Sequence, residues 1–120
     1  AFLATVESAA DTIWKEAVRH AVDTSTALTR TFSGKFARGI RNSFMSEMAP
    51  FENEVAPYPL QNTITTPIRK AAQTQQNKDY MSLWCGQVGA KEHELTVSDL
   101  IATLVREVDD ALLHLNSRDH

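Results

Sequence analysis

The segment from Val97 to Leu115 places its apolar residues on one side of a helix, and no other pattern constrains the fold as strongly. At about 100° per residue these side chains cover an arc of about 140°, which is typical of an amphipathic helix. Thr96, with Asp99 three residues later, resembles a capping box with Asp in place of the usual Glu or Gln. We therefore predict a helix over 97–115 that buries this arc against the rest of the chain or a partner. The arc consists of Val97, Leu100, Ile101, Leu104, Val105, Val108, Ala111, Leu112 and Leu115.

Two further helices are predicted in the first half of the chain. Residues 8–21 carry apolar side chains at three- and four-residue spacing, and either Ser8 or Asp11 can cap their first turn. Residues 41–48, "RNSFMSEM", indicate a second, shorter helix.

Threonines and alternating side chains over residues 26–32 indicate a short strand, and Ser33–Gly34 indicates a turn after it. The segment 49–62 holds three of the four prolines, which remove backbone donors and restrain the preceding residue, so we predict a loop there.

A later helix is predicted to begin at Thr66–Pro67, with a hydroxyl cap and proline in the first turn, and to fade over 73–79. A second short helix would carry Tyr80, Leu83 and Trp84 on one side and stop at Gly86. The expected fold class is thus mainly α, with one or two short strands.

Composition excludes several classes of protein. The chain has 120 residues, 42% hydrophobic and 22% charged, which is ordinary for one globular domain or part of a larger one. A net charge of −3 gives no indication of a nucleic-acid or membrane-surface partner. No apolar run approaches the ~20 residues of a membrane span. The single cysteine, Cys85, fits a reducing compartment, and we expect a cytoplasmic protein. The opening "AFLATVES" is interpreted as a start inside a fold.

The chemically reactive side chains do not define a reaction by themselves. No histidine has a second ligand at zinc-like spacing, so no metal site is predicted among His20, His93, His114 and His120. Cys85 would lie near a helix C-terminus, where the dipole disfavours a thiolate, so a structural role is favoured. Residues 30–41 hold four basic residues and no acid, and Gly34 and Gly39 there would permit a close approach of the backbone. This segment indicates either a phosphate site or a solvated basic loop.

Three stretches together resemble the C-terminal portion of bacterial nitronate monooxygenases, formerly called 2-nitropropane dioxygenases. They are "AFLATVES…KEA" near the start, "LTRTFSGKFARGIRNSF" at 28–44 and "YPLQNTITTPIRKAA…YMSLWCGQ" at 58–87. The resemblance spans roughly residues 1–90, in the order and spacing of that family.

This resemblance implies a flavin enzyme on a TIM (β/α)8 barrel, with FMN at the C-terminal ends of the strands. Residues 1–25 would form the end of the last barrel strand and the following helix, and residues 26–120 a mostly helical cap over the active site. The implied reaction oxidises alkyl nitronates with O2 to carbonyl compounds and nitrite. The catalytic histidine and the Gly-Thr pair that helps to hold the FMN phosphate would belong to an N-terminal barrel portion, so no catalytic residue is expected in this segment.

The resemblance also suggests where the chain would meet the cofactor. Gly86 would let the backbone approach an isoalloxazine edge, and Gln87 would offer a donor and an acceptor there. Trp84 could form a wall of the substrate pocket, although an aromatic residue in step with Tyr80 is more often part of a core. Gly86 is expected to mark a helix end, with a positive φ or a close backbone contact.

Two alternatives remain. A flavin-dependent enoyl reductase would share the barrel and the flavin site. A non-enzymatic helical interaction module would use the C-terminal helix as a docking surface, and an apolar arc that stays exposed would favour it.

Overall fold

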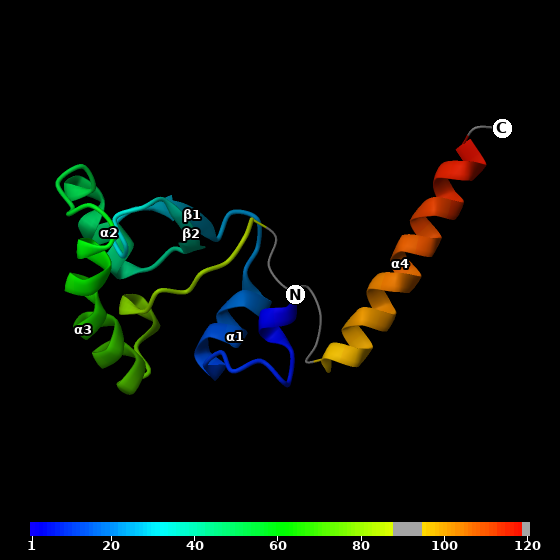
Figure 1. The fold of residues 1–120 in the computed structure, drawn as a ribbon, viewed down its shortest axis with the longest axis horizontal. Coiled ribbons are helices and arrows are strands. Elements are labelled where there is room, and N and C mark those ends of the chain that lie inside the picture. Colours follow the sequence, from blue (N-terminus) through cyan, green and yellow to red (C-terminus); the bar gives the residue numbers. More distant parts are fainter. Residues whose placement is uncertain (88–94, 119–120) are drawn as a thin grey trace.

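The computed structural model describes residues 1–87 and 95–118, and they form a mainly helical chain with one two-stranded sheet (Figure 1). The α-helices are α1 (Thr12–His20), α2 (Ser43–Met48), α3 (Leu60–Thr74) and α4 (Val97–Arg118), and the strands are β1 (Thr26–Thr29) and β2 (Ala37–Ile40). Short 3-10 helices are η1 (Phe2–Ala4), η2 (Ala49–Phe51) and η3 (Lys78–Tyr80). The expected fold class, mainly α with one or two short strands, is confirmed for these residues.

Helix α1 begins later than the predicted span of 8–21 because Asp11, and not Ser8, caps it. The Asp11 carboxylate accepts a hydrogen bond from the Ile13 amide at 2.9 Å, which satisfies one of the free N–H groups of the first turn. Ser8 instead accepts from the Ala10 amide in the preceding loop. The helix itself is confirmed.

Strands β1 and β2 form an antiparallel hairpin in which Thr26 pairs with Ile40 and Thr29 with Ala37. The predicted strand 26–32 is therefore confirmed over its first four residues and turns earlier than expected. Gly34 lies in the connection with a φ of +89°, which favours glycine. Strand β2 falls within the basic segment 30–41, so the interpretation of that whole segment as a loop is wrong.

Helix α2 confirms the helix predicted over 41–48, and Asn42 explains its position. The Asn42 side chain accepts from the Met45 amide and donates to the carbonyl oxygens of Lys78 and Met81 at 3.1 and 2.8 Å. One buried amide thus caps the helix and fixes the segment that follows η3.

Helix α3 begins six residues before Thr66, and the predicted start at Thr66–Pro67 is wrong. Pro67 lies inside the helix, where it removes one backbone hydrogen bond. Tertiary contacts hold the two turns before it, because Gln61 and Thr65 donate to the carbonyl oxygens of Thr31 and Phe32 at 2.8 and 2.5 Å. These long-range bonds outweigh the local preference of proline for a first turn. The predicted fading over 73–79 is confirmed, since α3 ends at Thr74.

The core consists of two small clusters that Tyr80 joins. Phe32, Phe44 and Met45 form the first, and Ala72, Met81 and Leu83 form the second. Phe32 lies 4.7 Å from Phe44 between ring centroids, and Phe44 lies 6.3 Å from Tyr80 in an edge-to-face arrangement.

Helix α4 confirms the helix predicted over 97–115 and its cap. The Asp99 amide donates to Thr96 Oγ1 at 3.1 Å, and the Val97 amide donates to the Glu7 carboxylate at 3.0 and 3.2 Å. Beyond this anchored end the helix extends away from the other elements (Figure 1), and the radius of gyration is 17.8 Å. A compact domain of this length would have a radius of gyration of about 14 Å.

The apolar arc of α4 is mostly exposed, so it does not pack against the rest of the described chain as one of the two predicted alternatives required. The other alternative, packing against a partner, stays a prediction. Leu100, in the first turn, is buried at 7% exposure, but Leu104 is 39% exposed and Val108 is 57% exposed. Among the described residues, no helix, including the 22 residues of α4, is both long and apolar enough to cross a membrane.

Candidate functional site

The segment from Met81 to Gln87 is extended, and the predicted helix carrying Tyr80, Leu83 and Trp84 to a stop at Gly86 is wrong. Helical geometry ends at Tyr80 with η3. The Leu83 carbonyl accepts from the Ile40 amide at 2.9 Å, and the Cys85 amide donates to the Arg38 carbonyl at 3.1 Å. These bonds to β2 satisfy backbone groups that a local helix would otherwise have to pair.

Gly39 is a point of close contact between this segment and the sheet. It forms an isolated antiparallel bridge with Trp84. A methyl group on Gly39 would lie 3.2 Å from the Leu83 carbonyl oxygen and 3.2 Å from Cε3 of Trp84. The absence of a side chain at Gly39 therefore permits the pairing, as its place in the basic segment suggested.

Trp84 is half-buried and contacts two other aromatic residues, one through its ring and one through its backbone carbonyl. Its ring packs on the first core cluster and meets Phe32 edge-to-face at 5.6 Å between centroids. Its carbonyl oxygen accepts a hydrogen bond from the indole Nε1 of Trp14 at 3.0 Å. Sequence reasoning treated Trp14 as an ordinary apolar position of a helix, and no local signal could indicate a contact 70 residues away.

Gly86 and Gln87 are both exposed, and the expectation that Gly86 marks a helix end is wrong. Gly86 has no positive φ, and a methyl group there would meet no described heavy atom within 4 Å. The Gln87 side chain makes no hydrogen bond to the described residues. Gly86 therefore leaves open space beside the backbone, and the Gln87 side-chain amide is available to bind a neighbouring group.

Cys85 is partly buried in the same extended segment. Removal from water raises the pKa of its thiol. A thiol with a raised pKa is a poor nucleophile, which agrees with the structural role favoured from the sequence. The cause is burial and not a helix C-terminus.

Three of the four basic side chains of residues 30–41 contact separate partners. The Arg30 guanidinium lies 5.6 Å from the centroid of the Phe36 ring, and Lys35 Nζ lies 4.8 Å from that of Tyr58. Arg38 Nη1 donates to Thr26 Oγ1 at 3.2 Å across the hairpin. This arrangement favours local cation–π and hydrogen-bond contacts over a shared phosphate site.

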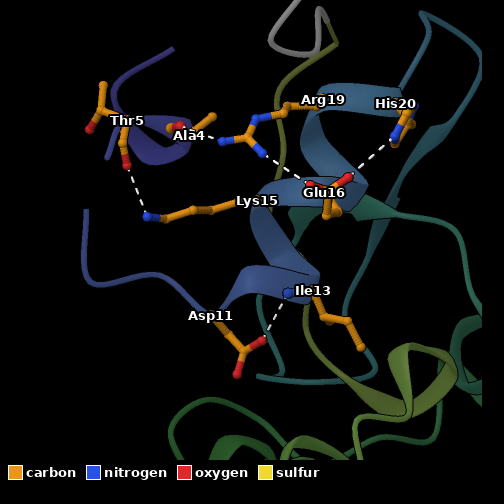
Figure 2. Close-up of polar contacts among 8 residues, drawn as sticks. All are labelled: Ala4, Thr5, Asp11, Ile13, Lys15, Glu16, Arg19 and His20. Carbon is orange, nitrogen blue, oxygen red and sulfur yellow. Dashed lines mark hydrogen bonds and ion pairs between the residues drawn. The ribbon is translucent and has the colours of Figure 1, made fainter. Parts of the chain in front are cut away.

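Two cationic side chains of helix α1 donate hydrogen bonds to backbone carbonyls near the start of the chain (Figure 2). Lys15 Nζ donates to the Thr5 carbonyl at 2.9 Å, and Arg19 Nη2 donates to the Ala4 carbonyl at 3.1 Å. On the next turn His20 faces Glu16 at 3.3 Å, in an exposed pair.

The described histidines do not form part of a cluster of three or more possible metal ligands. His20 pairs with Glu16, and His114 lies on the exposed part of α4. Within 1–87 and 95–118, no three side chains of His, Cys, Asp or Glu come together as a metal site would require. His93 and His120 lie outside the described residues.

A cavity of about 290 Å³ lies between the start of α1 and one face of α3. Arg69 lines it beside Trp14 and Met81, and burial lowers the pKa of this guanidinium. Arg69 is engaged within α3, where Nη2 donates to the Asn62 carbonyl at 2.9 Å. Its guanidinium is thus engaged by groups of its own helix.

Comparison with known proteins gives a consistent match. The nitronate monooxygenase family model matches residues 1–107. A probable nitronate monooxygenase of Bacillus subtilis (strain 168) is 44% identical over 108 residues, which cover 89% of this chain and 31% of that protein. One from Staphylococcus haemolyticus (strain JCSC1435) is 40% identical over 112 residues, covering 93% of this chain and 31% of that protein. The chain therefore spans about a third of the length of these relatives.

Solved structures agree with the sequence matches. Nitroalkane oxidase from Streptomyces ansochromogenes superposes with a TM-score of 0.86 and 37% identity, over 96% of this chain and 33% of that one. FabK from Thermotoga maritima superposes with a TM-score of 0.75 over 97% of this chain and 37% of that one. At 24% identity, the second likeness concerns the fold alone.

Proposed function

The chain belongs to the nitronate monooxygenase family, and on this basis we propose that it is the C-terminal part of an FMN-dependent enzyme. This enzyme oxidises alkyl nitronates with O2 to carbonyl compounds and nitrite. The observation that carries the proposal is the likeness to nitroalkane oxidase, with 37% identity and a TM-score of 0.86 over 96% of the chain.

In this proposal residues 1–25 are the end of the last strand of a TIM barrel and the helix after it, and residues 26–120 are a cap. The contacts of Lys15 and Arg19 with the first residues support the N-terminal unit, because they join α1 to the segment before it. The remaining barrel, with the catalytic groups and the phosphate site, would belong to the two-thirds of the relatives' length outside this match. No catalytic residue is assigned within the chain.

Gly86 and Gln87 are the residues proposed to meet the flavin. The open space around Gly86 fits a flat ring laid against the backbone, and the Gln87 amide can donate to and accept from a ring edge. Trp84 is proposed to wall the substrate pocket with the part of its ring that the core leaves exposed. The flavin, when bound, supplies the redox chemistry that transfers electrons from the nitronate to O2. The chain's residues would orient the ring and exclude water.

A non-enzymatic interaction module is the second candidate, and the exposed arc of α4 favours it. Leu104, Val105 and Val108 are 39%, 57% and 57% exposed, a pattern expected of a docking helix. The family match is the stronger argument, because it covers α1, the hairpin, α2 and α3 together. An enoyl reductase has weaker support, since the likeness to FabK concerns the fold alone.

The full-length enzyme that carries this segment provides the test. Purified with its flavin, it should consume O2 and release nitrite when an alkyl nitronate is added. It should not oxidise NADH or NADPH with an enoyl thioester. Reduction of the enoyl thioester without nitrite release would favour the reductase. A protein without flavin that still captures a partner through α4 would favour the interaction module.

A further inference from the structure

The indole of Trp14 donates a hydrogen bond to the Trp84 carbonyl, at the start of the "WCGQ" segment (residues 84–87). In an extended strand the backbone groups of successive residues point to opposite edges. Leu83 and Cys85 direct their carbonyl and amide to β2. The Trp84 carbonyl points to the other edge, where Trp14 Nε1 donates to it at 3.0 Å.

Trp14 is itself held in place from several sides. Its ring packs on the second core cluster, which contains Met81 and Leu83. The helix that carries it is capped by Asp11. Arg19 and Lys15 of the same helix donate hydrogen bonds to the last residue of η1 and to the residue after it (Figure 2). The indole N–H therefore reaches Trp84 from a fixed support and not from a flexible side chain.

The residues that follow have no comparable support. Gly86 meets no described atom in the space where a side chain would lie, and Gln87 is exposed. Glycine also has the widest conformational freedom of any residue. The peptide plane between Trp84 and Cys85 is thus the last support before Gly86, with its carbonyl bonded to Trp14 and its amide bonded to the Arg38 carbonyl.

We propose that Trp14 is a positioning residue, whose N–H fixes this peptide plane and so aims Gly86 and Gln87 at the edge of the flavin ring. The proposal rests on the function proposed above. It assigns to α1 a role in the cofactor site that its apolar pattern alone would not indicate.

The test uses the full-length enzyme with Trp14→Phe, which keeps an aromatic ring and removes the donor. Loss of one hydrogen bond predicts flavin binding weaker by roughly 2- to 12-fold. The flavin absorption spectrum should change, and the Cys85 amide, which donates to the Arg38 carbonyl from the same peptide plane, should exchange faster with deuterium. Ile13→Val is the matched control, because Ile13 packs on the same cluster from the same helix without this bond. It should leave the spectrum and the exchange rates unchanged.

If Trp14→Phe does not fold, 3-benzothienylalanine at position 14 keeps the bicyclic ring and replaces the N–H by sulfur. Flavin affinity, spectrum and exchange equal to those of Ile13→Val would overturn the proposal. A wild-type enzyme that holds no flavin would overturn the proposed function instead. In that case, unchanged exchange at Cys85 in Trp14→Phe would also overturn the positioning role.

Discussion

Gly39 and Trp84 face each other across an antiparallel bridge so close that a methyl group on Gly39 would lie 3.2 Å from Cε3 of Trp84. The same methyl group would lie 3.2 Å from the Leu83 carbonyl oxygen, which is held by the Ile40 amide and cannot move without loss of that bond. Gly39→Ala should therefore lower the free energy of unfolding by about 1–3 kcal/mol, the usual cost of overpacking. Urea unfolding followed by circular dichroism measures it.

Gly86→Ala is the control, because a methyl group there meets no described atom within 4 Å. It should not destabilise the chain, and the smaller entropy of the unfolded state should raise the free energy of unfolding by up to about 1 kcal/mol. In the full-length flavoenzyme Gly86→Ala should instead weaken FMN binding. Equal losses of stability in the two variants would contradict the close approach at Gly39.

Asn42 combines a helix cap with two long-range hydrogen bonds, so its replacement should be costly. Asn42→Ala removes the acceptor for the Met45 amide and the donors to the Lys78 and Met81 carbonyls. Loss of a cap costs about 0.5–2 kcal/mol, and each buried group left unpaired about 1–3 kcal/mol. We expect a total loss of about 2–5 kcal/mol in urea unfolding.

Asn42→Asp separates these two contributions. The carboxylate keeps the acceptor of the cap but faces two carbonyl oxygens without a donor, so this variant should be at least as destabilised as Asn42→Ala at pH 7. An Asn42→Asp protein close to the wild type in stability would mean that the cap alone matters.

The hydrogen bond from Tyr80 to Glu47 should make stability depend on alkaline pH. Tyr80 Oη donates to the Glu47 carboxylate at 2.8 Å, and this bond, with the carboxylate's charge, raises the pKa of Tyr80 above its ordinary value of 10.0. A pKa raised by folding means that the contribution is fully present below pH 10 and is lost as the pH rises through the folded-state pKa. Thermal melts between pH 8 and pH 11 should show this loss, and Tyr80→Phe should reduce it.

The same interaction can be followed directly in a Tyr58→Phe variant, where Tyr80 is the remaining tyrosine. Its phenolate absorbance should appear at higher pH than in the urea-unfolded chain. Adding Glu47→Gln should bring the two titrations closer together. A Tyr80 titration that Glu47→Gln leaves unchanged would disprove the coupling.

Local patterns predicted those elements whose partners lie nearby in sequence. The Asp11 and Thr96 caps and the apolar spacing of α4 depend on residues within a few positions, so α1 and α4 could be predicted. The start of α3 could not, because Gln61 and Thr65 are held by carbonyl groups about 30 residues earlier. The "WCGQ" segment was mistaken for a helix because its partners are in β2 and α1, and nothing near it in sequence indicates them.

The residues of the candidate site come from the resemblance to the family, and the sequence did not predict how the chain arranges them. The resemblance to the family indicated Trp84, Gly86 and Gln87, and their role at a flavin stays a prediction. Their extended conformation depends on Gly39 and Trp14, which come together with them only in the folded chain. Spacing could suggest that Gly39 permits a close approach, but it could not identify what approaches.

Leu100 and Leu104 lie one turn apart on α4 and should respond differently to truncation. Leu100 is 7% exposed, so Leu100→Ala in the described chain should cost about 2–5 kcal/mol. Leu104 is 39% exposed, and Leu104→Ala should cost less, about 0.5–1.5 kcal/mol, because fewer contacts are lost.

The apolar arc of α4 is wider than a coiled-coil seam and fits a broad apolar surface. If the rest of the proposed flavoenzyme supplies that surface, Leu104→Ala should cost about 2–5 kcal/mol in the full-length protein. Melts of both variants in both contexts measure the difference. A Leu104→Ala loss that stays small in the full-length enzyme would mean that the arc faces solvent there, and would favour α4 as a docking helix for another protein.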